Sequence, residues 1–170
     1  REWSELDRNG YRLISSGLFL AVWPWLAVKY REGFNERMGS YPHSGQNERP
    51  LWVHAVSVGE VQAAWPLIRR ARCAGWRDPV LLTTITRTGR KMAEDLVGGD
   101  ADRMAYYPWD APWVVKRAIG SVNPAAFITV ETEIWPNFIF ELREHGIPAF
   151  IANGRFSERS FRKALKNREF

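Results

Sequence analysis

Glu60 has the residue type and the sequence setting for acid–base chemistry. It ends the run LWVHAVSVGE, in which the apolar residues stop at Ser57-Val58-Gly59. The apolar part predicts a buried strand, and Gly59 permits the tight turn into a helix that begins at or just after Glu60. We therefore expect an exposed carboxylate at the carboxyl end of a strand, able to accept a proton from an attacking hydroxyl. The sequence leaves open an alternative, a first-turn Glu that the helix macrodipole stabilises.

A second polar cluster follows the apolar run PVLLTTI at residues 79–85. It supplies hydroxyls, an Arg and a Gly at the start of a predicted helix, an arrangement that binds phosphate or sugar hydroxyls through backbone amides. The GxxxxGK[ST] spacing of a P-loop is missing. Roles as strand and capping residues remain an open alternative for each Thr. The residues that we predict to contact a substrate in these two segments are Ser57, Gly59, Thr83, Thr84, Thr86, Arg87, Thr88 and Gly89.

Two further carboxylates, Glu131 and Glu133, follow the apolar run AAFITV. If the strand continues, residues two apart face the same side, and the two charges repel unless cations or hydrogen bonds offset the repulsion. Capping of the following helix is the alternative role. Arg155 follows the last apolar run in the same way and is a further candidate for substrate binding.

The order of apolar runs indicates how these residues are brought together. Strand patterns at 51–56, 79–85, 103–107, 125–130 and 148–152 alternate with helix patterns, for which Gly98, Gly120 and Gly146 are predicted ends. This alternation predicts an α/β fold with a Rossmann-like, doubly wound and mainly parallel sheet. Ligands of such sheets bind outside the carboxyl ends of the strands. All the candidate residues follow predicted strands, so we expect them at one edge.

Other kinds of chemistry find less support. No cluster of His, Cys and carboxylate residues has metal-site spacing, and no GxGxxG follows the first strand. We therefore expect neither a metal nor a bound dinucleotide cofactor. His54 lies within a strand and is predicted to be a core histidine. Cys73, the single cysteine, is predicted to be a packing residue and indicates a reducing compartment.

The segment before the sheet has a different composition. Residues 13–28 are apolar but contain Ser15, Ser16, Gly17 and Pro24, and the run is shorter than the ~20 residues that span a bilayer. Trp23 and Trp25, followed by cations, indicate an interfacial anchor, and a hairpin packed on the main domain is the alternative. We predict three parts: a helical membrane-associating segment (1–32), a linker (33–49) and the Rossmann-like domain (50–170).

The net formal charge of +5 favours an anionic partner. Seven basic residues and one acidic residue lie between Arg69 and Lys91, and six basic and two acidic residues between Arg155 and Glu169. These stretches are candidate contact surfaces or simply solvated helix faces. A lipid-binding module without catalysis and a nucleic-acid-binding domain are the rival functions, although no nucleic-acid-binding fold or RNP-like signature is present, and we expect no nucleic-acid partner.

Five ordered blocks resemble one enzyme family. The similar segments are HAVSVGE (54–60), TTITRTG (83–89), YYPWDAPW (106–113), VETEIWPN (130–137) and NGRFSERS (153–160). In these segments the chain is similar to the N-terminal half of the Kdo transferases, which transfer 3-deoxy-D-manno-octulosonic acid (Kdo) in lipopolysaccharide synthesis. Three positions depart from the usual family pattern, namely Arg87, Gly154 and Phe156. Arg87 adds positive charge close to a phosphorylated acceptor.

The resemblance implies a two-domain GT-B glycosyltransferase that moves Kdo from CMP-Kdo to the lipid A precursor with inversion and without a metal. It implies that Glu60 is the general base, that Glu131 stabilises the transition state, and that the enzyme is anchored at the cytoplasmic face of the inner membrane. CMP-Kdo would be held mostly by a C-terminal domain absent from this chain. The chain begins at Arg1 without Met and ends within a predicted basic helix, so we expect a fragment; because that domain is missing, we expect the fragment to be inactive alone.

Overall fold

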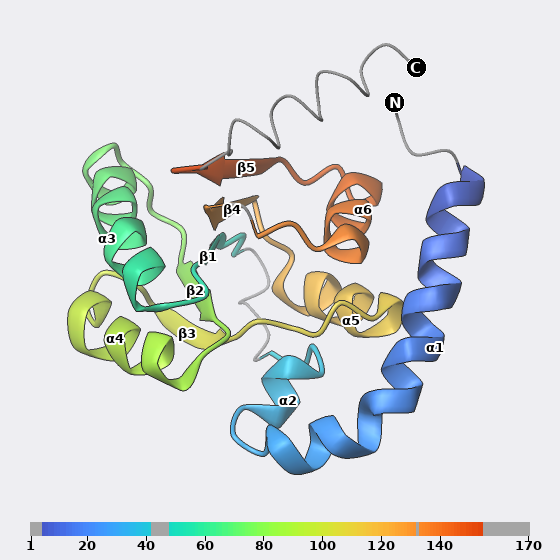
Figure 1. The fold of residues 1–170 in the computed structure, drawn as a ribbon. Helices are drawn as coiled ribbons and strands as arrows, with labels where there is room; N and C mark the ends of the chain where they lie inside the picture. The colour runs from blue at the N-terminus through green and yellow to red at the C-terminus, as the bar shows by residue number, and fades with distance from the viewer. Residues whose placement is uncertain (1–4, 42–47, 132, 155–170) are drawn as a thin grey trace.

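The protein is built around a five-stranded, wholly parallel sheet, which the computed structural model describes together with its helices over residues 5–41, 48–131 and 133–154 (Figure 1). The strand order is β3-β2-β1-β4-β5, so the direction of winding reverses between β1 and β4. The strands are β1 (Leu51–His54), β2 (Val80–Thr84), β3 (Arg103–Tyr106), β4 (Ala126–Val130) and β5 (Ala149–Ala152). This order confirms the predicted α/β, doubly wound fold.

Two pairs of helices cover the two faces of the sheet (Figure 1). The helices α3 (Val58–Cys73) and α4 (Arg87–Val97) pack on one face, and α5 (Pro112–Val122) and α6 (Pro136–Glu144) on the other. Each face has its own apolar core. β1, in the middle of the sheet, is buried along its whole length, as a central parallel strand requires.

Trp52 occupies the centre of the core under α5 and α6 and is fully buried. Its ring meets Tyr41, Phe127 and Phe138 edge-on at centroid distances of 5.4, 6.1 and 5.1 Å. Its indole N–H donates to the Thr83 hydroxyl over 2.9 Å. This bond satisfies the polar atom that a buried Trp brings with it, so the hydroxyl at Thr83 is part of the core.

The predicted helix ends were less accurate than the strands. α3 begins at Val58, two residues before Glu60. α5 passes through Gly120, where we had predicted its end, and continues to Val122; the next residue, Asn123, closes the helix in the left-handed conformation with a φ of 45°. Cys73 lies at the end of α3 and is exposed, so its predicted role in packing was wrong.

The first part of the chain is a single helix rather than a hairpin. α1 (Glu5–Lys29) has 25 residues, none of them buried, and is long and apolar enough to cross a membrane. This property is compatible with membrane association. The predicted linker is partly structured, since it contains the short helix α2 (Phe34–Arg37), and Tyr41 beyond it is part of the core.

Candidate active site

Glu60 lies in the first turn of α3, and its carboxylate is held by the turn that precedes the helix. One carboxylate oxygen accepts a hydrogen bond from the backbone N–H of Val56 (2.8 Å) and the other from the hydroxyl of Ser57 (3.0 Å). The residue is only 9% exposed, so the expectation of a freely exposed side chain was wrong. The reason is local: Glu60 lies three residues after the N-cap position, Ser57, and reaches back to the donors at the start of the helix. Each oxygen still has a lone pair for another donor.

Gly59 is exposed in the same turn, and its backbone has no positive φ. A Cβ added to Gly59 would meet no atom within 4 Å. The turn therefore does not require a glycine at position 59, contrary to our prediction. The space beside it gives access to the start of α3.

The loop between β2 and α4 is bonded directly to the turn that holds Glu60. The carbonyl oxygen of Val56 accepts hydrogen bonds from the backbone N–H of Ile85 and Thr86 and from the Thr86 hydroxyl. The Thr86 hydroxyl in turn caps α4 by accepting from the N–H of Gly89 (3.0 Å). A Cβ on Gly89 would lie 2.9 Å from the Val56 carbonyl oxygen, so glycine allows the two loops to touch.

The other predicted residues of this loop differ in accessibility. Thr83 and Thr84 are fully buried, which argues against contact with a substrate. Thr83 instead accepts from Trp52 and lies 3.1 Å from Nδ1 of His54, a buried histidine whose pKa is lowered by burial to about 3. Thr88 and Arg87 are exposed, and the Arg87 guanidinium pairs with Glu32 over 2.6 Å.

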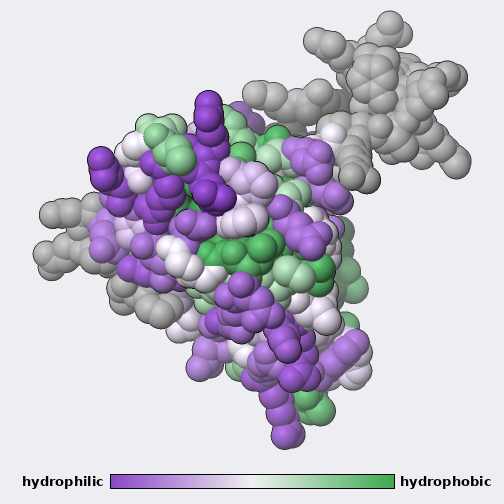
Figure 2. Space-filling view, turned by 90° about the vertical axis from the view of Figure 1, so that its left-hand side faces the viewer, coloured by the Kyte–Doolittle hydropathy of each residue, from purple (hydrophilic) through white to green (hydrophobic). Residues whose placement is uncertain are grey.

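A cavity of about 640 Å³ opens beside Arg87 and Thr88, between the start of α4 and the residues around α2. Both signs of charge line it, with Arg90 and Lys91 opposite Glu32 and Glu36. Figure 2 shows the side of the molecule that α3 and α4 form, which is mostly hydrophilic. The predicted basic stretch from Arg69 to Lys91 lies on these two helices and the strand between them.

Glu131 and Glu133 lie just beyond the carboxyl end of β4. Glu131 has a φ of 63°, an uncommon conformation for a residue other than glycine, and its N–H donates to the carbonyl oxygen of Ala152 (2.8 Å). β4 ends at Val130, so the predicted strand alternation across Glu131 and Glu133 does not apply. Arg155 lies outside the described residues.

The three carboxylates come together where the winding of the sheet reverses. Burial raises the pKa of Glu133, and the negative charges of Glu60 and then Glu131 raise it further. Glu60 follows β1 and the other two follow β4, its neighbour in the sheet. This is the position at which doubly wound sheets bind their ligands.

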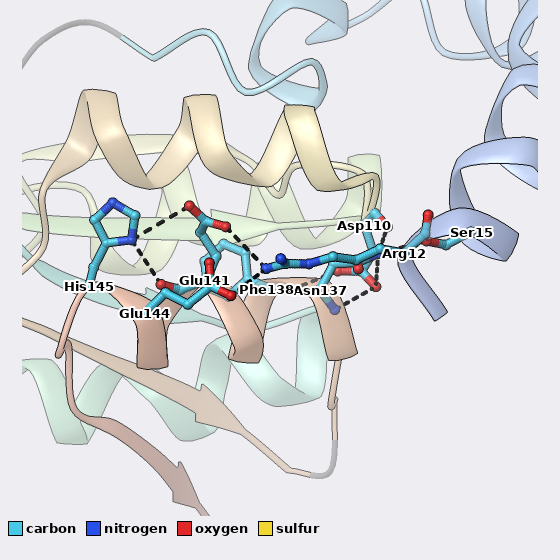
Figure 3. A network of polar contacts seen from close by, with 8 residues as sticks. All are labelled: Arg12, Ser15, Asp110, Asn137, Phe138, Glu141, Glu144 and His145. Carbon is cyan, nitrogen blue, oxygen red and sulfur yellow. Dashed lines mark hydrogen bonds and ion pairs between the residues drawn. The ribbon is translucent and has the colours of Figure 1, made fainter. Parts of the chain in front are cut away.

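The sequence analysis missed Asp110, which lies between β3 and α5. Its carboxylate caps α6, accepting hydrogen bonds from the backbone N–H of Phe138 (2.9 Å) and Asn137 (3.2 Å). Figure 3 shows how the side chain of Asn137 returns to Asp110. One signal in the sequence was available: Trp135 and Pro136 at the start of α6 lack a capping side chain, so the cap had to come from elsewhere.

A doubly wound parallel sheet with carboxylates at its switch point defines a Rossmann-like domain with a ligand site at the carboxyl edge. The particular family follows from comparison with known sequences. The chain belongs to the 3-deoxy-D-manno-octulosonic-acid transferase (Kdo transferase) family, whose N-terminal profile matches residues 32–170.

Individual relatives agree with this assignment. The chain is 33% identical to the 3-deoxy-D-manno-octulosonic acid transferase of Bordetella pertussis, over 94% of this chain and 40% of the relative. It is 38% identical to the protein of the same name from Haemophilus influenzae, over 87% and 35%. A bifunctional glycosyltransferase/methyltransferase of Fusobacterium nucleatum is 26% identical, over 92% and 24%. The chain thus spans well under half of the length of these relatives.

Proposed function

We propose that this chain is the acceptor-binding domain of an inverting GT-B glycosyltransferase that moves Kdo from CMP-Kdo to the lipid A precursor. In this proposal Glu60 removes the proton from the acceptor hydroxyl as that hydroxyl attacks the anomeric carbon of Kdo. CMP then leaves toward a second domain outside this chain. The enzyme works at the cytoplasmic face of the inner membrane and needs no metal or cofactor.

The position of Glu60 is the observation that supports the proposal most strongly. A general base has to be held within hydrogen-bond reach of its proton, and Glu60 is fixed by Val56 and Ser57 at the switch point of the sheet. Both contacts are donors to the carboxylate oxygens, so they fix the orientation of the group that would accept the proton. The neighbouring loop, bonded to the same turn, presents Thr88 and Arg87 to the acceptor side.

Glu131 is proposed to stabilise the positive charge that develops on the Kdo ring as CMP leaves. A fixed carboxylate at the place where charge develops lowers the barrier most when it needs no reorganisation. The strained backbone of Glu131 and its bond to Ala152 support such a fixed position. The acceptor is proposed to be surrounded by Ser57, Gly59, Thr86, Thr88, Gly89, Glu133 and Arg155.

The experiment that tests this function is mass analysis of the products after the full-length protein is incubated with CMP-Kdo and the lipid A precursor. We expect a product heavier than the acceptor by Kdo, with release of CMP. Binding of the acceptor without any CMP release would instead favour a lipid-binding module without catalysis.

The Gly89→Ala variant is expected to lower kcat about tenfold or more, because the new Cβ would press on Val56 and shift the turn that holds Glu60. The measurement is the rate of CMP release by the folded variant. Gly99→Ala is the matched control, since a Cβ at Gly99 meets no atom within 4 Å. An unchanged kcat in Gly89→Ala would show that the contact between the loops does not position Glu60.

A further inference from the structure

α1 contacts the rest of the molecule through a stripe of residues spaced by four. Tyr11, Ser15, Phe19 and Trp23 follow one another on the same side of the helix. Tyr11 meets the ring of Phe140 edge-on at 6.3 Å, and Phe19 and Trp23 both meet Trp109, at 5.7 and 6.3 Å. The helix is thus docked along α6 and the start of α5, as Figure 1 shows on one flank of the molecule.

Polar bonds reinforce the first half of this contact (Figure 3). The side chain of Arg12 pairs with Glu144 at 2.8 Å and lies 3.7 Å from Glu141. The Ser15 hydroxyl accepts from the side-chain amide of Asn137 (3.0 Å). The polar residues in the middle of α1 therefore face the domain.

The opposite side of α1 is apolar and faces away from the domain. By the helical period it consists, between residues 10 and 28, of Gly10, Leu13, Ile14, Gly17, Leu18, Ala21, Pro24, Trp25 and Val28. None of these nine described residues is charged, and Leu13 and Leu18 are 75% and 63% exposed. A helix on the surface of a water-soluble domain turns its apolar side inward. α1 docks through the aromatic residues Tyr11, Phe19 and Trp23 and is apolar on its outer side as well, so this second, exposed side is suited to an apolar medium.

We infer that α1 lies in the plane of an anionic bilayer surface, with this apolar side in the lipid and the domain docked on its aqueous side. The identity of the membrane rests on the proposed function, whereas the orientation of the helix rests on the contacts of α1. As long as α1 remains docked on the domain, it lies at the interface and does not span the bilayer.

The docked contacts exclude the spanning orientation. They extend from Tyr11 to Trp23, about 18 Å along the axis at 1.5 Å per residue. A helix crossing the bilayer would carry this length of the domain into the hydrocarbon, together with the ion pair of Arg12 and Glu144 and the partly buried carboxylate of Asp110. Charged groups there are expensive. An in-plane helix leaves them in water.

Cations beside α1 favour a negatively charged lipid surface. Lys29 ends the helix with its ammonium group 4.3 Å from the centroid of the Trp25 ring, and the exposed Arg31 follows. Beside the first half of α1 a cavity of about 200 Å³ has Arg8 and Arg143 among its lining residues, with Ile134, Ile139 and Phe140 as apolar ones. Apolar surface flanked by guanidinium groups complements anionic lipid.

The test is a depth measurement by spin-label EPR on the full-length protein bound to vesicles of phosphatidylethanolamine and phosphatidylglycerol. Labels are placed by the Ile14→Cys, Ala21→Cys and Val28→Cys substitutions, which are seven residues apart on the outer side. Native cysteines, Cys73 included, are replaced by Ser. We expect three similar depths, roughly 5–10 Å below the headgroups. A deep label at residue 21 with shallow labels at 14 and 28 would show a spanning helix and overturn the inference.

A flotation assay with the same vesicles supplies the second measurement. Leu18→Glu is expected to weaken vesicle partition about tenfold or more, and Ala63→Glu, at an exposed site on α3, is the matched control. Equal flotation of both variants, or a dimer formed through α1 with no lipid binding, would overturn the inference. Kdo transfer to detergent-solubilised acceptor, measured in parallel, distinguishes failure of this geometry from failure of the proposed function.

Discussion

The Glu60→Gln variant of the full-length protein is expected to lose a factor of about 10²–10⁴ in kcat for Kdo transfer, the contribution of a positioned general base. Gln has the same shape, and its amide can still accept from the N–H of Val56 and donate to the Ser57 hydroxyl. The fold and the acceptor affinity should therefore persist while the proton acceptor is gone. The measurement is the rate of CMP release at saturating substrate, together with the urea midpoint.

Two comparisons make this result specific. Ser57→Ala removes one of the two bonds to the carboxylate and leaves the base in place, so we expect a smaller loss of kcat. Glu94→Gln, an exposed residue of α4 paired with Arg90, removes the same charge elsewhere and should leave kcat unchanged. Near-normal turnover of the Glu60→Gln variant would remove Glu60 from the role of base.

Replacing Asp110 by Ala is expected to destabilise the domain by about 2 kcal/mol or more, because the two N–H groups at the start of α6 lose their acceptor. Asp110→Asn keeps one carbonyl oxygen in place and should cost less. Urea unfolding of both variants provides the comparison. Equal stability of wild type and Asp110→Ala would show that water replaces the cap without cost.

Asp110 also predicts an unusual dependence of stability on pH. Burial raises the pKa of Asp110 to about 6, against the hydrogen bonds from residues 137 and 138 that lower it. The folded chain therefore holds this proton more tightly than the unfolded chain, whose Asp titrates near 3.8. The contribution of Asp110 to the free energy of unfolding is complete below pH 3.8, and it is lost as the pH rises through about 6. The Asp110→Asn variant should lack this pH dependence. Identical pH profiles of the unfolding free energy for the wild type and this variant would contradict the prediction.

The sequence predicted those features that depend on neighbouring residues. Apolar runs bounded by Gly and Pro placed all five strands, and alternation with helices implied the parallel sheet and a common edge for Glu60 and Glu131. Helix ends were harder. Gly120 carries a common end signal, yet α5 continues to Val122, because Ala118, Ile119 and Val122 extend its buried side and packing outweighs the cost of one glycine.

Features that depend on distant residues could not be predicted. Asp110 caps a helix that begins 26 residues later; the start of α6 shows that a cap is missing, but no local pattern identifies Asp110 as the residue that supplies it. The burial of Thr83 depends on Trp52, which lies on the neighbouring strand and takes its hydroxyl as an acceptor. The orientation of α1 was equally hidden, since both sides of this helix carry apolar residues and only the docked contacts tell which side faces inward.

The hydrogen bond from Glu131 to Ala152 connects the candidate catalytic residue to β5, one of the two edge strands of the sheet. β5 leaves Phe150 and Ile151 about half exposed, at 55% and 45%. More of the same polypeptide or another molecule could cover this margin of the sheet. It would then contact β5, whose last residue, Ala152, accepts the hydrogen bond from the backbone of Glu131. In the proposed mechanism, the rate of Kdo transfer should therefore depend on whether this apolar margin is covered.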